Sequence, residues 1–374
     1  MSGRRDGRTA AMWLGCAIAM AALIPSGCVH RESEKRSDAF RLLEQARSVA
    51  SDLGDDLWPS LTSVPFRTLI VEEGEETLFC FEGEPPLGFT GLDAEPVPGC
   101  PAARRARVFD PTFLATFPLS DGVATIVIGT PQATGKTDEE WVVTVIHEHL
   151  HQLQYGCPDY FGRTSALGLD GGDETGMWML DYPFPYFDDR VSVAIDDLAQ
   201  SLEDAMPAEG DEFDRALGRY RAARRELEAI VSAADIRYFD FQSRQEGVAR
   251  HVERKAAADW SGHHATARTE RDRLVRELSE LDLASHGRTA FYAIGHAQAI
   301  LLDRVDPSWP SRYCEGELSL HSRIPPANCP AQSETSEAGA SIHRSGESQP
   351  DPALDGSDDF PKRREIAGRI LCED

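Results

Sequence analysis

The chain has 374 residues, with 38 lysines and arginines against 63 aspartates and glutamates, which gives a formal net charge of -25. This balance argues against a nucleic-acid partner, because binding to the phosphate backbone depends on basic side chains that displace counterions. Anionic membrane surfaces are disfavoured for the same reason. Hydrophobic residues make up 41% of the chain, which is enough to bury the core of one large domain or two smaller ones.

The first 27 residues resemble a bacterial export signal. Three arginines within the first eight residues precede an apolar run over 10–24, which is shorter than a membrane-spanning helix requires. Ser26, Gly27 and Cys28 resemble the junction of a lipoprotein signal, in which the cysteine is lipidated after cleavage. Pro25 stands where that junction usually has an aliphatic residue, so cleavage with release and an uncleaved anchor stay open as alternatives. We therefore expect an exported protein, either a cell-envelope lipoprotein of the outer membrane or periplasm or a secreted chain, whose predicted membrane contact is a lipid on Cys28.

Cysteine usage agrees with an exported chain. Six cysteines follow the export signal and its Cys28, namely Cys80, Cys100, Cys157, Cys314, Cys329 and Cys372. An even number in an oxidising compartment predicts up to three disulfides. The shortest loops to close would join Cys80 to Cys100 and Cys314 to Cys329. No CxxC pair occurs, which argues against a cysteine zinc site and a thioredoxin-like redox centre.

The order of elements predicts a small sheet followed by a helical half. A polar spacer over 28–37 leads into an amphipathic helix over 38–53, whose apolar residues recur at helical spacing. Runs of β-prone residues predict strands over 66–71, 77–81 and 123–128. Helical periodicity predicts further helices over 138–155, 191–205, 212–233, 244–260, 265–283 and 289–305. Thr137 and Glu140 form a capping box for the first of these, and Gly156 is expected to end it in a left-handed conformation.

These elements predict an α+β fold in which one catalytic domain covers residues 38–325. Residues 330–361 are rich in Ser, Glu, Asp, Gly and Pro, which predicts a disordered acidic tail. A short C-terminal segment over 362–374 follows. The chain contains no G-x-S-x-G motif, which argues against a serine hydrolase of that type.

The helix predicted over 138–155 carries an HExxH motif. His147 and His151 are four residues apart, so both imidazoles leave the same face of the helix and can share one metal ion. Glu148 lies beside them and can act as a base, because zinc lowers the pKa of a bound water to about 7 and a carboxylate can then take its proton. His149 points to the opposite side and is expected to be a structural or surface histidine. The alternative interpretation makes all three histidines polar residues of a partly exposed helix.

A catalytic zinc site normally has three protein ligands. The HExxHxxGxxH variant does not apply, because Gln154 and Cys157 occupy its Gly and last His positions. Downstream, residues 246–249 read Glu-Gly-Val-Ala. HExxH followed by a helix that carries a Glu-Gly-x-Ala sequence resembles the gluzincin clan of zinc metallopeptidases. This resemblance implies a zincin-like fold in which Glu246 is the third zinc ligand.

Two alternatives concern this second helix. Ser243 and Glu246 match a capping box, so Glu246 could instead cap its own helix. Glu253 lies two turns further along the same face and is a second candidate, either as a ligand or as the partner of an imidazole N–H. His251 is expected to be an exposed polar residue.

Other segments have possible roles around such a site. The strand over 123–128 could be an edge strand that pairs with extended substrate, or an ordinary core strand. The segment over 171–189 combines glycines with aromatic residues, which suits a lid or a tucked-in hydrophobic loop. Candidates for stabilising an oxyanion are Tyr238, Tyr292 and His296, each of which could equally be a packing residue.

The sequence therefore predicts an exported, zinc-dependent metallopeptidase. His147, His151 and Glu246 are expected to bind Zn2+, and Glu148 to activate the zinc-bound water against a peptide bond of a peptide or protein substrate. The alternative is a non-catalytic envelope protein that keeps a zincin fold for binding or scaffolding. Glu148 favours catalysis, because a purely structural metal site needs no base beside its ligands.

Overall fold

The structure is a computed structural model that describes residues 26–173, 176–260 and 262–325. The export signal up to Pro25 and the tail predicted over 330–361 and 362–374, with Cys329 and Cys372, lie outside the described residues. The sequence predicts one domain over 38–325, whereas the described residues of that range pack as two compact units. The first unit contains the chain up to Ser48 together with Pro65–Val145, and the second contains Val49–Val64 and the chain from Ile146 onward.

Helix α1 (Ser26–Leu57) opens the described chain. It includes the helix predicted over 38–53 and begins earlier, so the residues predicted as a polar spacer are helical as well. The described part of α1 in the first unit buries a stripe at spacings of three and four, namely Ala39, Leu42, Leu43 and Ala46. Phe40 packs edge-to-face on Phe79 of the sheet, with ring centroids 4.9 Å apart.

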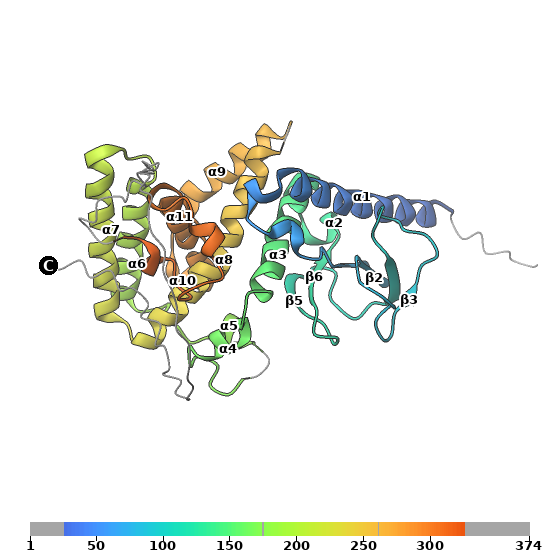
Figure 1. Ribbon diagram of the computed structural model, residues 1–374, viewed down its shortest axis with the longest axis horizontal. Helices are drawn as coiled ribbons and strands as arrows, with labels where there is room; N and C mark the ends of the chain where they lie inside the picture. Colours follow the sequence, from blue (N-terminus) through green and yellow to red (C-terminus); the bar gives the residue numbers. More distant parts are fainter. Residues whose placement is uncertain (1–25, 174–175, 261, 326–374) are drawn as a thin grey trace, which may run out of the picture. The chain divides into compact units, whose positions relative to one another are not determined.

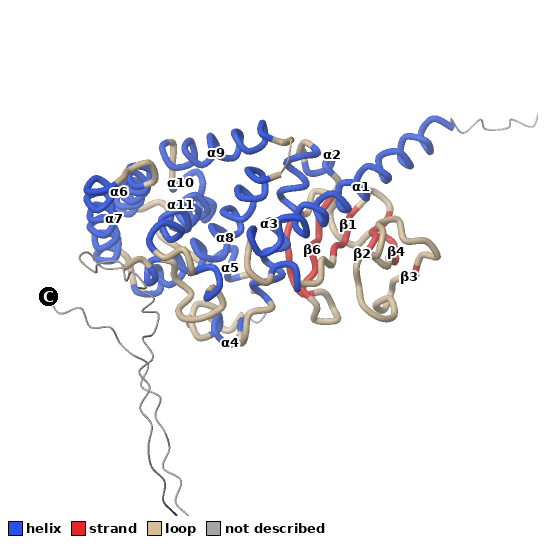
Figure 2. The backbone as a smooth tube through the Cα atoms, turned by 45° about the horizontal axis from the view of Figure 1, so that its top comes forward, coloured by secondary structure: helices blue, strands red, loops and turns tan. Residues whose placement is uncertain are grey.

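The first unit is built on one mixed sheet in the order β3-β4-β2-β1-β6-β5. Figure 1 labels β2, β3, β5 and β6 of this sheet. Its strands are β1 (Thr68–Val71), β2 (Glu75–Phe79), β3 (Thr90–Gly91), β4 (Ala102–Ala106), β5 (Leu114–Pro118) and β6 (Ala124–Gly129). β1 and β6 are parallel, and the other neighbouring strands are antiparallel. The strands are drawn in red in Figure 2. The predicted strands correspond to β1, β2 and β6, whereas β3, β4 and β5 were not predicted.

β6 is an interior strand of this sheet. Ile126 lies opposite Thr68 of β1, and Ile128 lies opposite Leu114 of β5. Ile126, Val127 and Ile128 are all fully buried. The edge-strand interpretation of 123–128 is therefore wrong and the core-strand interpretation is confirmed, because both sides of the strand are already hydrogen-bonded to neighbours.

The disulfide predicted between Cys80 and Cys100 is present in the first unit. The core of the same unit contains a cluster of buried apolar side chains, namely Leu69, Val71, Leu78, Phe81, Ala103 and Val127. The Cys80 backbone N–H donates to the Pro101 carbonyl at 3.0 Å, so the bridge and the backbone bond join the same two segments. Helix α2 (Pro131–Thr134) then leads from β6 to α3 (Asp138–Tyr155).

The second unit is helical. Its helices after α3 are α4 (Tyr160–Ser165), α5 (Trp178–Asp181), α6 (Asp189–Ala205), α7 (Gly210–Ile230), α8 (Ala233–Asp259), α9 (His264–Ser279), α10 (Leu283–His286) and α11 (Ala290–Val305). Long helices occur at all the predicted positions, and the bounds of α3 are those predicted. α8 begins well before residue 244, where the sequence predicted its start. Among the described residues, no helix is both long enough and apolar enough to cross a membrane.

The described part of the segment over 171–189 is packed onto the helices of its own unit. Tyr182 stacks on Tyr238 with ring centroids 4.4 Å apart, and Phe184 packs edge-to-face on Phe291 at 5.0 Å. Met177, Leu180 and Phe187 are exceptions, with 51%, 52% and 85% of their surface exposed. This packing corresponds to the tucked-in hydrophobic loop, although Gly171 and its neighbouring glycines adopt the positive φ expected of hinges.

Candidate metal centre

Helix α3 holds the HExxH motif in a fixed orientation. Thr137 and Glu140 form the predicted capping box, with the Thr137 N–H 2.9 Å from Glu140 Oε2 and the Glu140 N–H 3.2 Å from Thr137 Oγ1. Along the helix the apolar side chains are fully buried, namely Trp141, Val142, Val145, Ile146 and Leu150. Gly156 follows the end of α3 outside the left-handed region, contrary to expectation. A Cβ there would lie 3.3 Å from the Leu153 carbonyl oxygen, which is a tight contact.

Three side chains converge where α3 meets α8, all within the second unit. The Nε2 atoms of His147 and His151 are 3.2 Å apart. Glu246 Oε2 lies 3.6 Å from the first and 3.5 Å from the second. Among the described residues, these three form the one group of His, Cys, Asp or Glu with ligand atoms close enough to hold a metal ion. The prediction that His147, His151 and Glu246 lie together is therefore consistent with the geometry.

α8 and α11 cross in direct backbone contact at the residue after Glu246. A Cβ added to Gly247 would lie 2.4 Å from the Gly295 Cα atom, and one added to Gly295 would lie 1.9 Å from the Ser243 carbonyl oxygen. Two facing glycines thus allow the two backbones to approach. A larger residue after Glu246 would force α8 and α11 apart.

The capping interpretation of Glu246 is wrong. α8 begins at Ala233, and its capping box is formed by Ser232 and Asp235, with Ser232 Oγ 3.2 Å from the Asp235 N–H. Ser243 therefore lies inside the helix, where the backbone N–H groups already have partners one turn back. The earlier Ser-x-x-Asp cap was not predicted.

Glu253 binds the second nitrogen of His147. Its Oε2 lies 3.2 Å from His147 Nδ1, and Arg250 and Arg273 each hold this carboxylate from 3.3 Å. An ionised carboxylate accepts here, so Nδ1 carries a hydrogen and Nε2 is the nitrogen that faces the cluster. The prediction of Glu253 as the partner of an imidazole N–H corresponds to this contact.

Gln154 is the corresponding hydrogen-bond partner of His151 Nδ1. This role was not predicted. Gln154 Nε2 donates to the Gln245 carbonyl at 2.8 Å and to the Tyr313 hydroxyl at 2.7 Å. A backbone carbonyl can only accept, so the amide oxygen must face His151 Nδ1, 2.6 Å away. His151 Nδ1 therefore carries a hydrogen, and its Nε2 also faces the cluster. The residue that rules out the HExxHxxGxxH variant thus orients the second histidine.

A disulfide between Cys157 and Cys314 holds Tyr313 over Gln154. The Arg244 guanidinium packs over the Tyr313 ring, 3.9 Å from its centroid, and donates to the Tyr313 carbonyl at 2.7 Å. The predicted pairing of Cys314 with Cys329 is therefore wrong. Loop length alone favoured it, whereas the fold brings the chain after α11 to the end of α3, with the Cys157 and Cys314 Cα atoms 5.2 Å apart.

The charges around the cluster favour a cation at its centre. Burial disfavours the charged form of His147, but hydrogen bonds to Glu246 and Glu253 outweigh it and raise the pKa of His147 to about 9. Burial also opposes charging of His151, whose pKa is nevertheless raised by the Glu246 carboxylate. Burial would raise the pKa of Glu246, yet the two imidazoles hold it well below its usual range. The three groups therefore stabilise a positive charge where their ligand atoms meet.

These distances and donor types fit a zinc ion. Zinc binds imidazole nitrogen and carboxylate oxygen at about 2.0–2.2 Å, and two such ligands at the tetrahedral angle are then roughly 3.4 Å apart. The three separations of 3.2, 3.5 and 3.6 Å lie close to that value. Two imidazole lone pairs and a carboxylate that face one another repel unless a cation or proton lies between them.

Glu148 is buried next to this cluster. Its negative charge contributes to raising the pKa of His147 and His151. It also acts on Tyr155 at the end of α3, whose pKa burial and the charges of Glu246 and Glu148 raise to about 12. The carboxylate that the sequence assigns as base thus lies within electrostatic range of both histidines.

Among the oxyanion candidates, Tyr292 is the one whose pKa is raised by the charge of Glu246. Burial, followed by the charge of Glu246, raises its pKa, and the Arg288 guanidinium donates to its hydroxyl. Tyr238 instead donates to the Met179 carbonyl at 3.1 Å. Arg288 was not predicted as a partner of Tyr292, although residues four apart on a helix can contact each other.

Three further buried histidines lie outside the cluster. His149 is buried, and its Nδ1 lies 2.8 Å from Gln152 Oε1. Burial lowers its pKa to about 4, so it is neutral at pH 7. His251 is fully buried rather than exposed, contrary to expectation, with Nε2 3.0 Å from Asp303. His296 is also buried, and its ring packs against that of His251 with centroids 5.8 Å apart.

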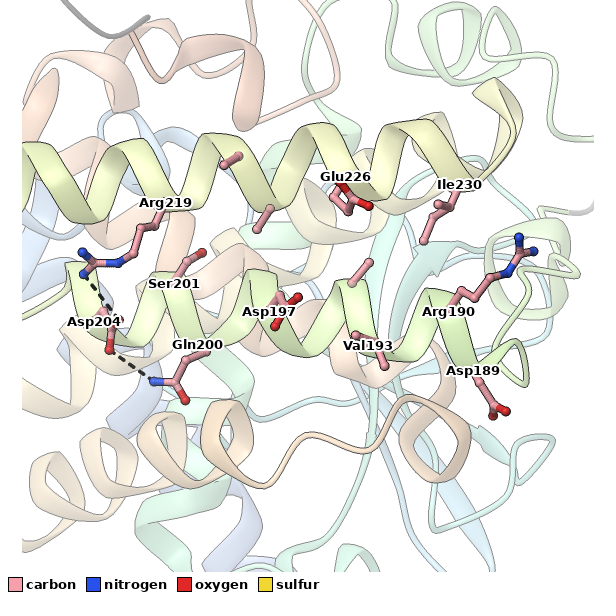
Figure 3. Close-up of a pocket in the computed structure, with 13 residues that line it drawn as sticks. Asp189, Arg190, Val193, Asp197, Gln200, Ser201, Asp204, Arg219, Glu226 and Ile230 are labelled. Carbon is pink, nitrogen blue, oxygen red and sulfur yellow. Dashed lines mark hydrogen bonds and ion pairs between the residues drawn. The ribbon is translucent and has the colours of Figure 1, made fainter.

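A separate hollow of about 840 Å3 lies between α6 and α7, and none of the cluster residues lines it (Figure 3).

No protein-family model, curated protein or solved structure matches this chain. The chemistry of the second unit must therefore be inferred from its own residues.

Proposed function

We propose that this chain is an exported zinc-dependent metallopeptidase. In this proposal His147, His151 and Glu246 bind Zn2+, and Glu148 is the general base. The observation that carries it is the convergence of two imidazole nitrogens and one carboxylate oxygen at separations of 3.2 to 3.6 Å. The zincin-like character of the α+β fold belongs to the same proposal.

Each residue has one part in the chemistry. Zinc bound here would supply Lewis acidity that polarises a peptide carbonyl and acidifies water. Glu148 takes the proton of the attacking water and passes it to the leaving amine. Tyr292, with Arg288 donating to its hydroxyl, supplies an O–H for the oxyanion that forms on the substrate carbonyl.

The number of protein ligands in the cluster supports catalysis over the alternative of a non-catalytic envelope protein. A structural zinc site is closed by four protein ligands, whereas a catalytic site has three. Among the described residues, the cluster contains three ligand atoms. The buried Glu148 beside them also fits a base better than it fits a scaffold, since an additional buried carboxylate is costly to a purely structural site.

Export is part of the same proposal. The two disulfides support a non-reducing compartment. The lipid anchor at Cys28 rests on the sequence of the signal junction.

Cys28→Ser should move the protein from the membrane fraction to the soluble fraction, and an unchanged distribution would refute lipidation at this residue.

Glu148→Gln tests the catalytic part of the proposal. The amide keeps the shape of the side chain and cannot take a proton, so we expect unchanged zinc content and a loss of hydrolysis of roughly 10²- to 10⁴-fold. Peptide-library cleavage followed by mass spectrometry measures the loss. Glu139→Gln, in the first turn of the same helix, is the control and should retain activity. Hydrolysis by Glu148→Gln at the wild-type rate would remove Glu148 from its role.

A further inference from the structure

Arg288 is a half-buried cation near the metal cluster of the second unit. It lies in a short turn over Gly287–Thr289, directly before α11, and donates to the Tyr292 hydroxyl. Its guanidinium carbon lies 5.7 Å from the centre of the Tyr292 ring. Tyr292 is about one helical turn before Gly295, where α11 crosses α8 at the residue after Glu246. The charge of Glu246 accordingly acts on both Arg288 and Tyr292.

Arg288 has no ion-pair partner among the described residues. The Glu246 carboxylate acts on it from beyond ion-pair distance, and the Tyr292 hydroxyl is the one acceptor that the described chain offers to its five N–H groups. Arg224 of the same unit shows the usual arrangement of a buried arginine, because its guanidinium binds Asp240 at 2.6 Å. A guanidinium that is partly removed from water needs such an acceptor.

The other polar groups around Arg288 are neutral hydroxyls. Its charge acts on Tyr186 and Tyr238. The Tyr186 hydroxyl donates to that of Tyr238, which in turn donates to the Met179 carbonyl at 3.1 Å. Burial raises the pKa of both tyrosines, so both are neutral at pH 7. An anion that balances Arg288 therefore has to come from a bound molecule.

A metal ion in the proposed site increases this demand. Zinc carries two positive charges, which the carboxylates of Glu246 and Glu148 balance. Glu253, the carboxylate behind His147, is already held by two arginines. No carboxylate of the cluster is then left to balance Arg288, so the loaded site attracts a negatively charged ligand.

The contact between Arg288 and Tyr292 limits where on a substrate this negative charge lies. In the proposed function the Tyr292 hydroxyl donates to the oxyanion. Three hydrogen bonds of about 2.8 Å and the width of the guanidinium then separate the oxyanion from an acceptor on Arg288, which is at most roughly 11 Å. An extended chain covers about 3.3–3.6 Å per residue, so the acceptor belongs to one of about three residues next to the scissile bond.

We propose that Arg288 binds a carboxylate of the substrate within three residues of the scissile bond. A guanidinium matches a carboxylate because two parallel N–H groups can donate to its two oxygens. The carboxylate is the C-terminus of the substrate or the side chain of an Asp or Glu. This inference rests on the proposed peptidase function and gives it a substrate class, namely peptides with a negative charge close to the cleaved bond.

Cleavage of matched peptides tests this specificity. A peptide that the wild type cleaves in a library is made with a free or an amidated C-terminus, and separately with the Asp and Glu near the bond replaced by Asn and Gln. We expect one of these changes to lower kcat/KM by roughly 10- to 100-fold, mainly through KM, because a charge-assisted pair is lost. A loss on amidation identifies the chain terminus, and a loss on side-chain replacement identifies an acidic residue.

Arg288→Gln should abolish this preference, so that the charged and uncharged peptides are cleaved with kcat/KM values within about twofold of each other. Arg288→Lys should retain a smaller preference, because an ammonium keeps the charge but cannot form two parallel bonds. Arg237→Gln removes an equal charge at an exposed arginine of α8 and should keep the full preference. Circular dichroism checks that all three variants keep their helices.

Binding without cleavage separates Arg288 from the chemistry. Fluorescence anisotropy with the Glu148→Gln protein compares the labelled peptide and its uncharged form. The charged form should bind about tenfold more tightly or better, and adding Arg288→Gln should remove the difference.

Equal binding and cleavage of the two forms, or a preference that persists in Arg288→Gln, would overturn this inference and leave the peptidase proposal intact. Absence of cleavage of every library peptide would contradict the peptidase proposal itself, and would leave Arg288 no substrate to recognise.

Discussion

At the residue scale, the two zinc-binding histidines of the proposed site are oriented by different partners. His147 donates to a carboxylate, Glu253, and His151 donates to an amide, Gln154. Gln154 is fully buried, and the Gln245 carbonyl and the Tyr313 hydroxyl fix the direction of its amide. The tautomer of His151 is thus decided by a chain of hydrogen bonds that ends on the backbone.

Gln154→Ala should therefore weaken metal binding. Loss of a hydrogen-bond partner behind a ligating histidine typically costs about 10- to 100-fold in metal affinity. Competition with a chromogenic chelator measures this directly. Gln152→Ala is a matched control, because it removes the same kind of partner, three residues on, from His149, which is not part of the cluster. Equal zinc affinities in the two variants would show that Gln154 does not orient His151.

At the element scale, the disulfide between Cys157 and Cys314 joins the end of α3 to the chain after α11. It holds Tyr313 where the tyrosine hydroxyl can bind Gln154, so the bridge supports the metal cluster as well as the fold. The other disulfide, between Cys80 and Cys100, belongs to the first unit, whereas every cluster residue belongs to the second.

This difference predicts separate effects of the two bridges. Cross-linking chain segments this far apart in sequence lowers the entropy of the unfolded chain and stabilises the fold by about 3–5 kcal/mol. Replacing either pair by serine should therefore lower the thermal midpoint, measured by calorimetry. Only Cys157→Ser with Cys314→Ser should also reduce zinc affinity, by about tenfold. A similar loss of affinity in Cys80→Ser with Cys100→Ser would contradict the link between the second bridge and the site.

At the scale of the whole molecule, the sequence predicted what depends on local spacing. The four-residue interval between His147 and His151 places them on one helix face without knowledge of the fold. The seven-residue interval between Glu246 and Glu253 places both on one face of α8 in the same way. Glu246 itself followed from a resemblance, because no local rule connects residue 246 to residue 151.

Features that depend on tertiary contacts were not predicted. β4 contains two arginines, yet it is a strand that pairs with β2, where Arg105 lies opposite Glu76 and binds its buried carboxylate at 2.8 Å. Pairing with the neighbouring strand, rather than the β propensity of its own residues, stabilises this segment as a strand. The role of Gln154 was missed for the same reason, since its partner Tyr313 lies 159 residues further along the chain. Contacts between residues this far apart in the sequence depend on how the helices pack.

The most direct test of the central claim is the metal content of purified residues 29–374, measured by elemental analysis after zinc has been offered. Wild type should contain about one zinc per chain, and His151→Ala should lose it, because two remaining ligands cannot hold the ion. His149→Ala, which removes a buried histidine of the same helix outside the cluster, should keep it. Absence of zinc from the wild type, or full zinc content in His151→Ala, would contradict the metal centre proposed here.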